Sequence, residues 1–137
     1  MTRYELETLW ASRTLSILRI VVGTIFIEHG TQKLFGFPVS QNPQPVLFSL
    51  AGVQGVIELI GGLLIIFGLL TRAAAFFLAG DMAVAYFMAH APKSLFPSIN
   101  GGDAAILYCF VFLYLVAAGG GPWSVDAMRG SSALNER

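Results

Sequence analysis

Several polar side chains interrupt an otherwise apolar stretch near the start of the chain. The stretch 23–37 contains Glu28, His29, Gln32 and Lys33. Carboxyl, imidazole and amine groups are the side chains that exchange protons in acid–base chemistry. A charged group at the centre of a bilayer costs about 2.5–3.5 kcal/mol on insertion scales. These side chains therefore need partners elsewhere in the chain, and the positions of those partners define a candidate site.

The composition favours a membrane protein. The 137-residue chain is 55% hydrophobic and 12% charged, with a mean hydropathy of +0.71, whereas about 25% of the residues of soluble domains are charged. The net charge is zero and the eight Lys and Arg form no patch, so we expect no nucleic-acid partner. The single cysteine, Cys109, permits no intramolecular disulfide and no Cys-x-x-Cys redox pair, and we interpret it as a small apolar residue.

The apolar segments predict an all-α fold, a transmembrane four-helix antiparallel bundle in a lipid bilayer. Prolines and glycines separate four segments, which we expect to span the bilayer at about 15–35, 46–70, 73–91 and 103–118. The very short link between the second and third segments predicts a tight helical hairpin. We divide the chain into a cytoplasmic lead-in at 1–14, a transmembrane domain at 15–120 and a cytoplasmic tail at 121–137, which we expect to be polar and frayed beyond Asp126.

The distribution of cations predicts the orientation of the bundle. The side that would hold both termini carries more positive residues than the opposite loops: Arg3, Arg13, Arg72, Arg129 and Arg137 against Lys33 and Lys93. Loops rich in Lys and Arg stay in the cytoplasm. We therefore expect a multi-pass protein of the inner membrane with both termini cytoplasmic.

Three carboxyl groups are expected at one depth in the bundle. Glu58 and Asp81 fall near the midpoints of their segments, and Glu28 falls about 4.5 Å from its midpoint at helical rise. Three such groups in a low-dielectric layer cannot all ionise beside His29 alone, so we expect a shared proton near neutral pH. We predict that Glu28, His29 and Glu58 form one coupled, proton-exchanging catalytic site.

Other polar residues are assigned by depth and by helical phase. Lys33 and Asp103 fall about 12 Å from the centre, and we expect them to pair. The second segment places Gln54, Gly55, Glu58, Gly61 and Gly62 on one face, where small residues admit another helix and the partner of Glu58. We assign ligand-binding roles to Gln32, Lys33, Asp81 and Asp103, structural roles to Arg19, Arg72 and Asn100, and no metal site. Polar groups that merely hold helices together, at about 0.6 kcal/mol each, remain the alternative.

Four groups of residues along almost the whole chain resemble the DoxX family of small four-helix membrane proteins. They are the segments 19–36 (from Arg19-Ile-Val-Val-Gly to Glu28-His-Gly-Thr-Gln-Lys), 58–72 (from Glu58-Leu-Ile-Gly-Gly to Thr71-Arg72), 100–108 (Asn-Gly-Gly-Asp) and 121–126 (Gly-Pro-Trp-Ser-Val-Asp). Asp103 stands where the family more often has Glu. The family takes its name from a membrane subunit associated with thiosulfate:quinone oxidoreductase, so the resemblance implies a redox-associated, quinone-linked role.

Three functions are consistent with this pattern. The first is a quinone-binding membrane subunit of an oxidoreductase, in which Glu28 and Glu58 exchange protons and His29 or Lys33 donates to a quinone carbonyl. The sequence has no Rossmann glycine motif and no Glu-x-x-His di-iron motif, so a redox partner protein would supply the electrons. The second is a small proton-coupled transporter. The third is a structural anchor subunit.

Overall fold

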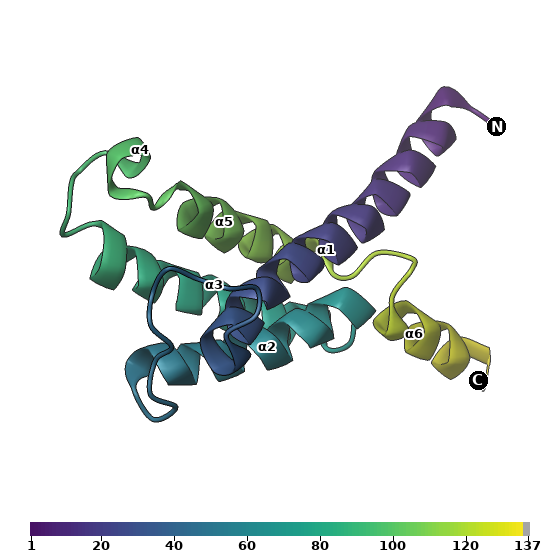
Figure 1. The fold of residues 1–137 in the computed structure, drawn as a ribbon. Coiled ribbons are helices and arrows are strands. Elements are labelled where there is room, and N and C mark those ends of the chain that lie inside the picture. Colours follow the sequence, from purple (N-terminus) through teal and green to yellow (C-terminus); the bar gives the residue numbers. More distant parts are fainter. Residues whose placement is uncertain (136–137) are drawn as a thin grey trace.

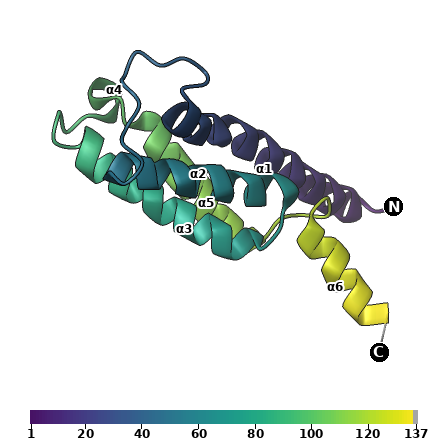
Figure 2. The same ribbon diagram turned by 60° about the horizontal axis from the view of Figure 1, so that its bottom comes forward.

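The computed structural model describes residues 1–135, and all of the regular secondary structure in that part of the chain is helical. The elements are α1 (Arg3–Phe35), α2 (Leu50–Phe67), α3 (Thr71–Ala85) with a π-helical extension η1 (Tyr86–His90), α4 (Pro97–Asn100), α5 (Asp103–Ala118) and α6 (Val125–Asn135). Figures 1 and 2 show α1, α2, α3 and α5 side by side. The N-terminus and α6 lie at one end of this bundle, and α4 lies at the other.

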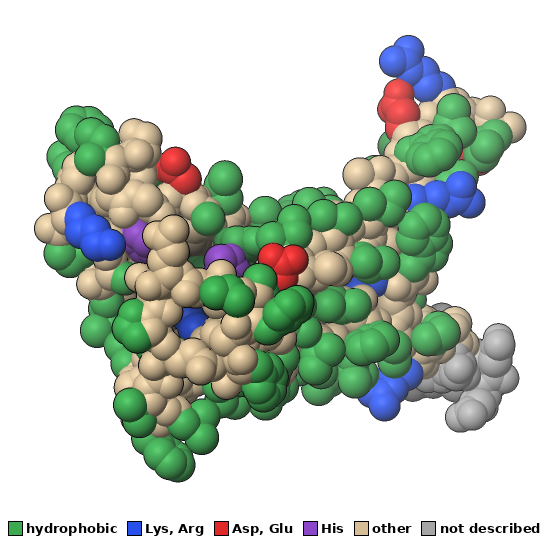
Figure 3. All heavy atoms as spheres, in the orientation of Figure 1, with side chains coloured by type: hydrophobic (Ala, Val, Ile, Leu, Met, Phe, Trp, Pro, Cys, Tyr) green, Lys and Arg blue, Asp and Glu red, His purple; other side chains and the backbone are tan. Residues whose placement is uncertain are grey.

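Within the described residues, three helices are long and apolar enough to cross a membrane: Arg3–Phe35, Leu50–Phe67 and Thr71–His90. Helix α5 is also apolar but has 16 residues, or about 24 Å at helical rise, which is shorter than the bilayer core. Figure 3 shows hydrophobic side chains over most of one face of the molecule. The fold is therefore an all-helical membrane fold, and the count of four complete spans stays a prediction.

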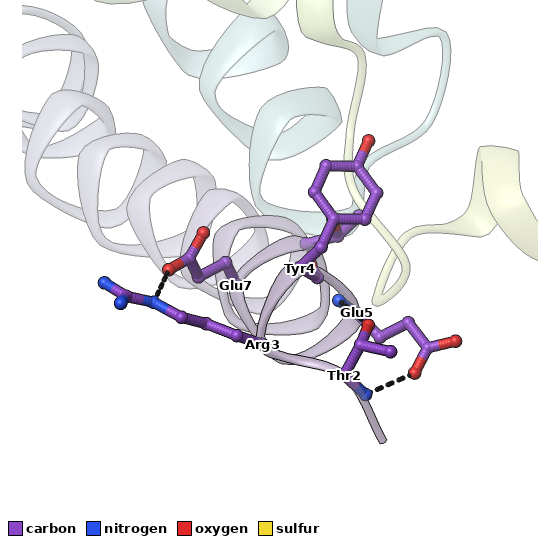
Figure 4. A network of polar contacts seen from close by, with 6 residues as sticks. Thr2, Arg3, Tyr4, Glu5 and Glu7 are labelled. Atoms are coloured by element: carbon purple, nitrogen blue, oxygen red, sulfur yellow. Dashed lines mark hydrogen bonds and ion pairs between the residues drawn. The ribbon is translucent and has the colours of Figure 1, made fainter.

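Helix α1 begins outside the bundle and is continuous. Thr2 caps it through a capping box, in which Glu5 N donates to Thr2 Oγ1 and Thr2 N donates to Glu5 Oε2. Arg3 and Glu7 add an exposed ion pair one turn later (Figure 4). The expected lead-in at 1–14 thus forms the first turns of the same helix that enters the bundle.

Glycines set the close approach of α1 to α2. A Cβ on Gly30 would lie 2.7 Å from the backbone nitrogen of Leu59, and a Cβ on Gly55 would lie 2.9 Å from Cβ of Lys33. Further along the helices, Gly62 lies against Ile27. Such contacts between small residues are the usual means by which membrane helices approach closely. The expected glycine face of α2 therefore does receive another helix, and that helix is α1.

The tight hairpin between α2 and α3 is confirmed, because only residues 68–70 separate the two helices. Leu70 adopts a left-handed conformation there, with φ 49°. Asp126 supports the turn: its carboxylate oxygens accept hydrogen bonds from Leu70 N and Thr71 N, each at 2.8 Å. The frayed tail expected beyond Asp126 is wrong within the described residues, because Val125–Asn135 form α6, whose first turn is anchored by Asp126 and Ser124. Arg137 lies outside the described residues.

Candidate functional site

The central polar contact joins α1 to α2. Lys33, in the last turn of α1, donates from Nζ to Oε1 of Glu58 at 2.7 Å. The Glu58 side chain is 2% exposed and that of Lys33 is 27% exposed. Gly55 lies one turn before Glu58 and leaves room for the lysine stem. The partner of Glu58 therefore arrives across the glycine face, as expected, and it is Lys33.

Asp81 joins this pair from α3. Its side chain is 9% exposed, interacts with the side chain of Gln54, and lies near enough to Lys33 and Glu58 for their charges to interact. Two of the carboxylate oxygens in this cluster, Glu58 Oε2 and Asp81 Oδ2, are buried and have no hydrogen-bond partner. A buried polar atom without a partner costs about 1–3 kcal/mol, and more when it is charged. We call Lys33, Gln54, Glu58 and Asp81 the carboxylate cluster.

A cavity of about 470 Å³ lies beside the carboxylate cluster, between α2 and α3. Asp81 and Gln54 are its polar lining residues. The rest of the lining is apolar and includes Val53, Ile57, Ile60, Leu64 and Phe77. Several of these side chains are exposed on the flank of the bundle, so the cavity opens toward the position of the bilayer. An apolar pocket with a few convergent polar groups is the usual form of a small-molecule site.

Glu28 and His29 lie on other sides of α1. Residue 30 faces α2, and residue 28 is rotated by about 200° from it in a helix. Glu28 is accordingly exposed, and the ring of His29 lies 6.0 Å from that of Tyr108 on α5 and 6.2 Å from that of Phe26. Glu58 thus meets Lys33 and Asp81 rather than Glu28 and His29.

The predicted pairing of Lys33 with Asp103 is wrong. Lys33 turns inward to Glu58, whereas Asp103 is exposed in the first turn of α5. The physical reason is the long, flexible lysine side chain, which reaches away from the depth of its own backbone. Gln32 donates to Pro38 O at 3.1 Å, and Gln32 and Lys33 both line a second cavity of about 240 Å³ under the loop 40–45.

The three residues assigned structural roles bind backbone groups. Arg19 is fully buried and donates to the carbonyl oxygens of Gly120, Ile65, Ile66 and Trp123, which connects the end of α2 to the segment before α6. Arg72 donates to Val116 O and Ala117 O at the end of α5. Asn100 accepts from Gly102 N and donates to Ser94 O.

Two polar residues of the structure were not assigned to a site from the sequence. Gln54 precedes Glu58 by four residues, so helical phase gave a signal for its place on the same face. Asp126 is the second, and no local pattern points from it to Leu70 and Thr71. Burial raises the pKa of Asp126, and the hydrogen bonds from the turn lower it by more, so the pKa is below its usual value.

No group of three or more His, Cys, Asp or Glu among the residues that the structure describes is placed to hold a metal ion. The candidate site is therefore described by its hydrogen-bonding groups and by its apolar cavity. Carboxylates, an amine and an amide beside an apolar space can bind the polar head of a lipid-soluble molecule and exchange protons with it.

Comparisons with known proteins agree on a membrane family. An uncharacterized protein of Haemophilus influenzae is 45% identical over 121 residues, which cover 82% of this chain and 87% of the relative. An uncharacterized membrane protein of Mycobacterium tuberculosis is 30% identical, with 80% and 77% covered. Inner membrane protein YqjF of Escherichia coli is 30% identical, with 82% and 88% covered. No solved structure matches. The model of the DoxX family matches residues 14–91, more than half of the chain, and this chain belongs to the DoxX family.

Proposed function

We propose that this protein is a membrane subunit that binds a quinone in the cavity between α2 and α3, with the quinone head at the carboxylate cluster. Glu58 and Asp81 exchange the protons of the quinone–quinol couple, and a redox partner protein exchanges the electrons. Glu28 and His29 lie on other flanks of α1, so the proton-exchanging role belongs to Glu58 and Asp81.

One observation carries this proposal: Asp81 lines the cavity, is 9% exposed, and has a carboxylate oxygen without a partner. A polar group that only held helices together would have its hydrogen bonds satisfied by neighbouring helices. The apolar lining matches the isoprenoid or alkyl portion of a membrane quinone. The opening on the flank of the bundle gives such a molecule a route from the bilayer without passage through water.

The ends of the bundle support a cytoplasmic location for both termini in the inner membrane. The N-terminus and α6 lie at the same end (Figure 2). That end of the bundle carries Arg3, Arg13, Arg72 and Arg129, whereas the opposite end carries Lys33 and Lys93. The excess of arginine favours the cytoplasm. Accessibility labelling of single cysteines placed at residues 5 and 93 tests this orientation, and a label on residue 5 from outside the cell would contradict it.

Equilibrium binding of decylubiquinone to the purified protein in lipid nanodiscs tests the proposed function. We expect saturable binding to the wild type and at least a tenfold weaker affinity for Asp81→Asn and for Ile57→Trp, which fills the cavity. Asp103→Asn is the matched control, because it makes the same chemical change at an exposed position.

The alternatives give different results. A structural anchor would bind no quinone in any variant. A transporter would retain proton-dependent flux in proteoliposomes whether or not quinone were present. Equal affinity of the wild type and Ile57→Trp would move the binding site away from the cavity and contradict the proposal.

A further inference from the structure

We infer that the carboxylate cluster exchanges protons, near neutral pH, with the water at one end of the bundle only, and that Lys33 is the residue that passes them. This end, the loop end, is where residues 36–49 lie, opposite the N-terminus and α6 (Figure 2). The inference rests on the proposed function, in which Glu58 and Asp81 exchange protons with a ligand, and adds the side that supplies them. In the orientation proposed above, that side is the outer one.

The cavity of about 240 Å³ under the loop 40–45, which we call the loop cavity, is polar. Its polar lining residues are Gln32, Lys33, Ser40, Asn42 and Gln44. Asn42 and Gln44 are exposed, so the loop cavity lies at the surface of the loop end. A polar space of this size accommodates water molecules, each of which needs two to four polar partners.

Lys33 connects the loop cavity with the interior. Its side chain lines that cavity and is 27% exposed, and its Nζ donates at 2.7 Å to Oε1 of Glu58, which is 2% exposed. The charge of Glu58 interacts in turn with that of Asp81, which lines the apolar cavity between α2 and α3. Lys33, Glu58 and Asp81 therefore form one chain of titratable groups from the loop cavity to the proposed ligand.

The transfer along this chain balances. The Lys33 ammonium gives one proton to Glu58 Oε1, and water in the loop cavity returns a proton to the neutral amine. The proton passes from Glu58 to Asp81 and then to the ligand. Each of these two carboxyl groups has a buried oxygen without a partner, which gives the proton a place at each step. Release of a proton by the ligand follows the same steps in reverse.

The bundle is apolar from the carboxylate cluster toward the termini. Ile65 lies two turns beyond Glu58, Leu78 lies about one turn from Asp81, and Phe26 lies two turns before Lys33. The side chains of Phe26, Ile65 and Leu78 are all 0% exposed. Leu78 also fills the space beside Gly61, where an added Cβ would lie 2.6 Å from its Cδ2. This packing leaves no polar group to carry a proton in that direction.

Arg19 adds an electrostatic barrier beyond these apolar residues. Its guanidinium is fully buried and donates to four backbone carbonyl oxygens, so it is a fixed positive charge at the end of the bundle that holds the termini. A guanidinium is not deprotonated in proteins, so it cannot pass a proton on. Its charge opposes the approach of another cation.

The neighbouring titratable groups belong to other surroundings. His29 is next to Lys33 and their charges interact, but its ring contacts those of Phe26 and Tyr108. Glu28 is exposed on another flank of α1. On α5, Cys109 packs against the apolar core. The charged groups that interact with the carboxyls of the cluster are therefore these carboxyls themselves and Lys33.

The experiment uses dicyclohexylcarbodiimide, a lipid-soluble reagent that adds to protonated carboxyl groups. Sealed right-side-out and inside-out membrane vesicles expose opposite ends of the protein, and the cysteine labelling described above identifies which. The external pH is varied from about 6 to about 9 while trapped buffer holds the interior near 7 and valinomycin with potassium removes the membrane potential. Tryptic peptides 34–72 and 73–93 report the label, because their single acidic residues are Glu58 and Asp81.

We expect labelling of Glu58 and Asp81 to fall at least about threefold as the pH rises at the loop end, and to be unchanged when the pH rises at the other end. Lys33→Met should abolish this response, read on peptide 73–93. Ala51→Trp, which fills the loop cavity and keeps Lys33, should weaken it. Lys93→Met, an exposed cation at the same end, is the control and should behave as the wild type.

Three results would overturn the inference: a response to the pH at the end that holds the termini, no response to either side, or an unchanged response in both Lys33→Met and Ala51→Trp. If Lys33→Met does not fold, Ala51→Trp decides alone. The reagent needs no quinone, so the two proposals fail separately. Quinone binding with labelling controlled from the other end would remove only this inference. Labelling controlled from the loop end without quinone binding would remove only the proposed ligand.

Discussion

Lys33 donates to Glu58 across the interface of α1 and α2 at 2.7 Å, and the two ends of this ion pair have different surroundings. Glu58 is 2% exposed in the interior, whereas Lys33 also lines the cavity under the loop 40–45. The pair therefore connects the loop end of the bundle with Asp81 and the cavity between α2 and α3. The sequence alone does not show which faces of α1, α2 and α3 turn toward one another, so it could not identify the residues that this pair meets.

The first prediction concerns the cost of breaking this pair. Lys33→Met leaves Glu58 buried without its cation, and loss of one partner of a buried ion pair costs about 3–5 kcal/mol. The double variant Lys33→Met with Glu58→Gln removes the stranded charge and should recover most of that loss. Thermal unfolding in detergent measures both. Lys93→Met, at an exposed position, is the control and should change little. A double variant less stable than Lys33→Met would contradict the assigned pairing.

The second prediction concerns helix packing. Gly30→Ala places a Cβ 2.7 Å from the backbone nitrogen of Leu59, so α1 and α2 must move apart. We expect a loss of about 1–3 kcal/mol of stability, as for overpacked interiors. Gly80→Ala is the matched control, because nothing lies within 4 Å of its added Cβ, and it should be neutral or stabilising by up to about 1 kcal/mol. Equal effects of the two substitutions in a melting experiment would refute this packing.

The third prediction concerns Arg19, whose guanidinium serves four carbonyl oxygens. A lysine keeps the charge but cannot reproduce the planar arrangement of donors. Arg19→Lys should release the segment before α6 and increase the rate of trypsin cleavage after Arg129. Arg3→Lys, whose side chain is 92% exposed, should leave that rate unchanged. Unaltered cleavage in Arg19→Lys would show that the four contacts do not hold the tail.

The fourth prediction concerns the pH dependence of the hairpin turn. Burial raises the pKa of Asp126, but its hydrogen bonds to the turn lower it further, to below the usual 3.8. Because the folded pKa lies below the unfolded one, the stabilisation is present above that usual value and disappears as the pH falls through the folded pKa. The melting temperature of the wild type should therefore exceed that of Asp126→Asn at neutral pH, and the difference should vanish in strong acid. A difference that persisted unchanged in acid would contradict this account.

Much of the fold could be predicted from residues that act locally. The apolar segments, the prolines of the first loop and the short link at residues 68–70 indicate a membrane bundle with a tight hairpin. The glycine face beside Glu58 also predicts where a second helix must approach. The extent of α6 could not be predicted in this way, because Asp126 is held by backbone groups 55 and 56 residues away.

The candidate site was harder to predict because its polar residues cover too much of α1. At 100° per residue, Glu28, His29, Gln32 and Lys33 span an arc of about 140° of the helix, so hydropathy does not decide which of them faces α2. The buried positions Ser16, Arg19, Gly23, Phe26 and Gly30 decide it, and they recur every three or four residues. The small residues among these positions, Ser16, Gly23 and Gly30, are the feature of the sequence that could have indicated the buried face of α1. No pattern in the sequence indicates that the Lys33 side chain reaches Glu58, which is seen only in the structure.

Photoaffinity labelling tests the central claim, that the ligand head lies at Asp81 in the cavity between α2 and α3, most directly. An azido derivative of a short-chain quinone is bound to the wild type in nanodiscs, irradiated, and located by mass spectrometry of the peptides. The account predicts label on the lining residues of α2 and α3, such as Ile57 and Phe77, that excess decylubiquinol removes and that Asp81→Asn reduces. Competed label on α1 and α5 around His29 and Tyr108, with α2 and α3 unlabelled, would contradict it.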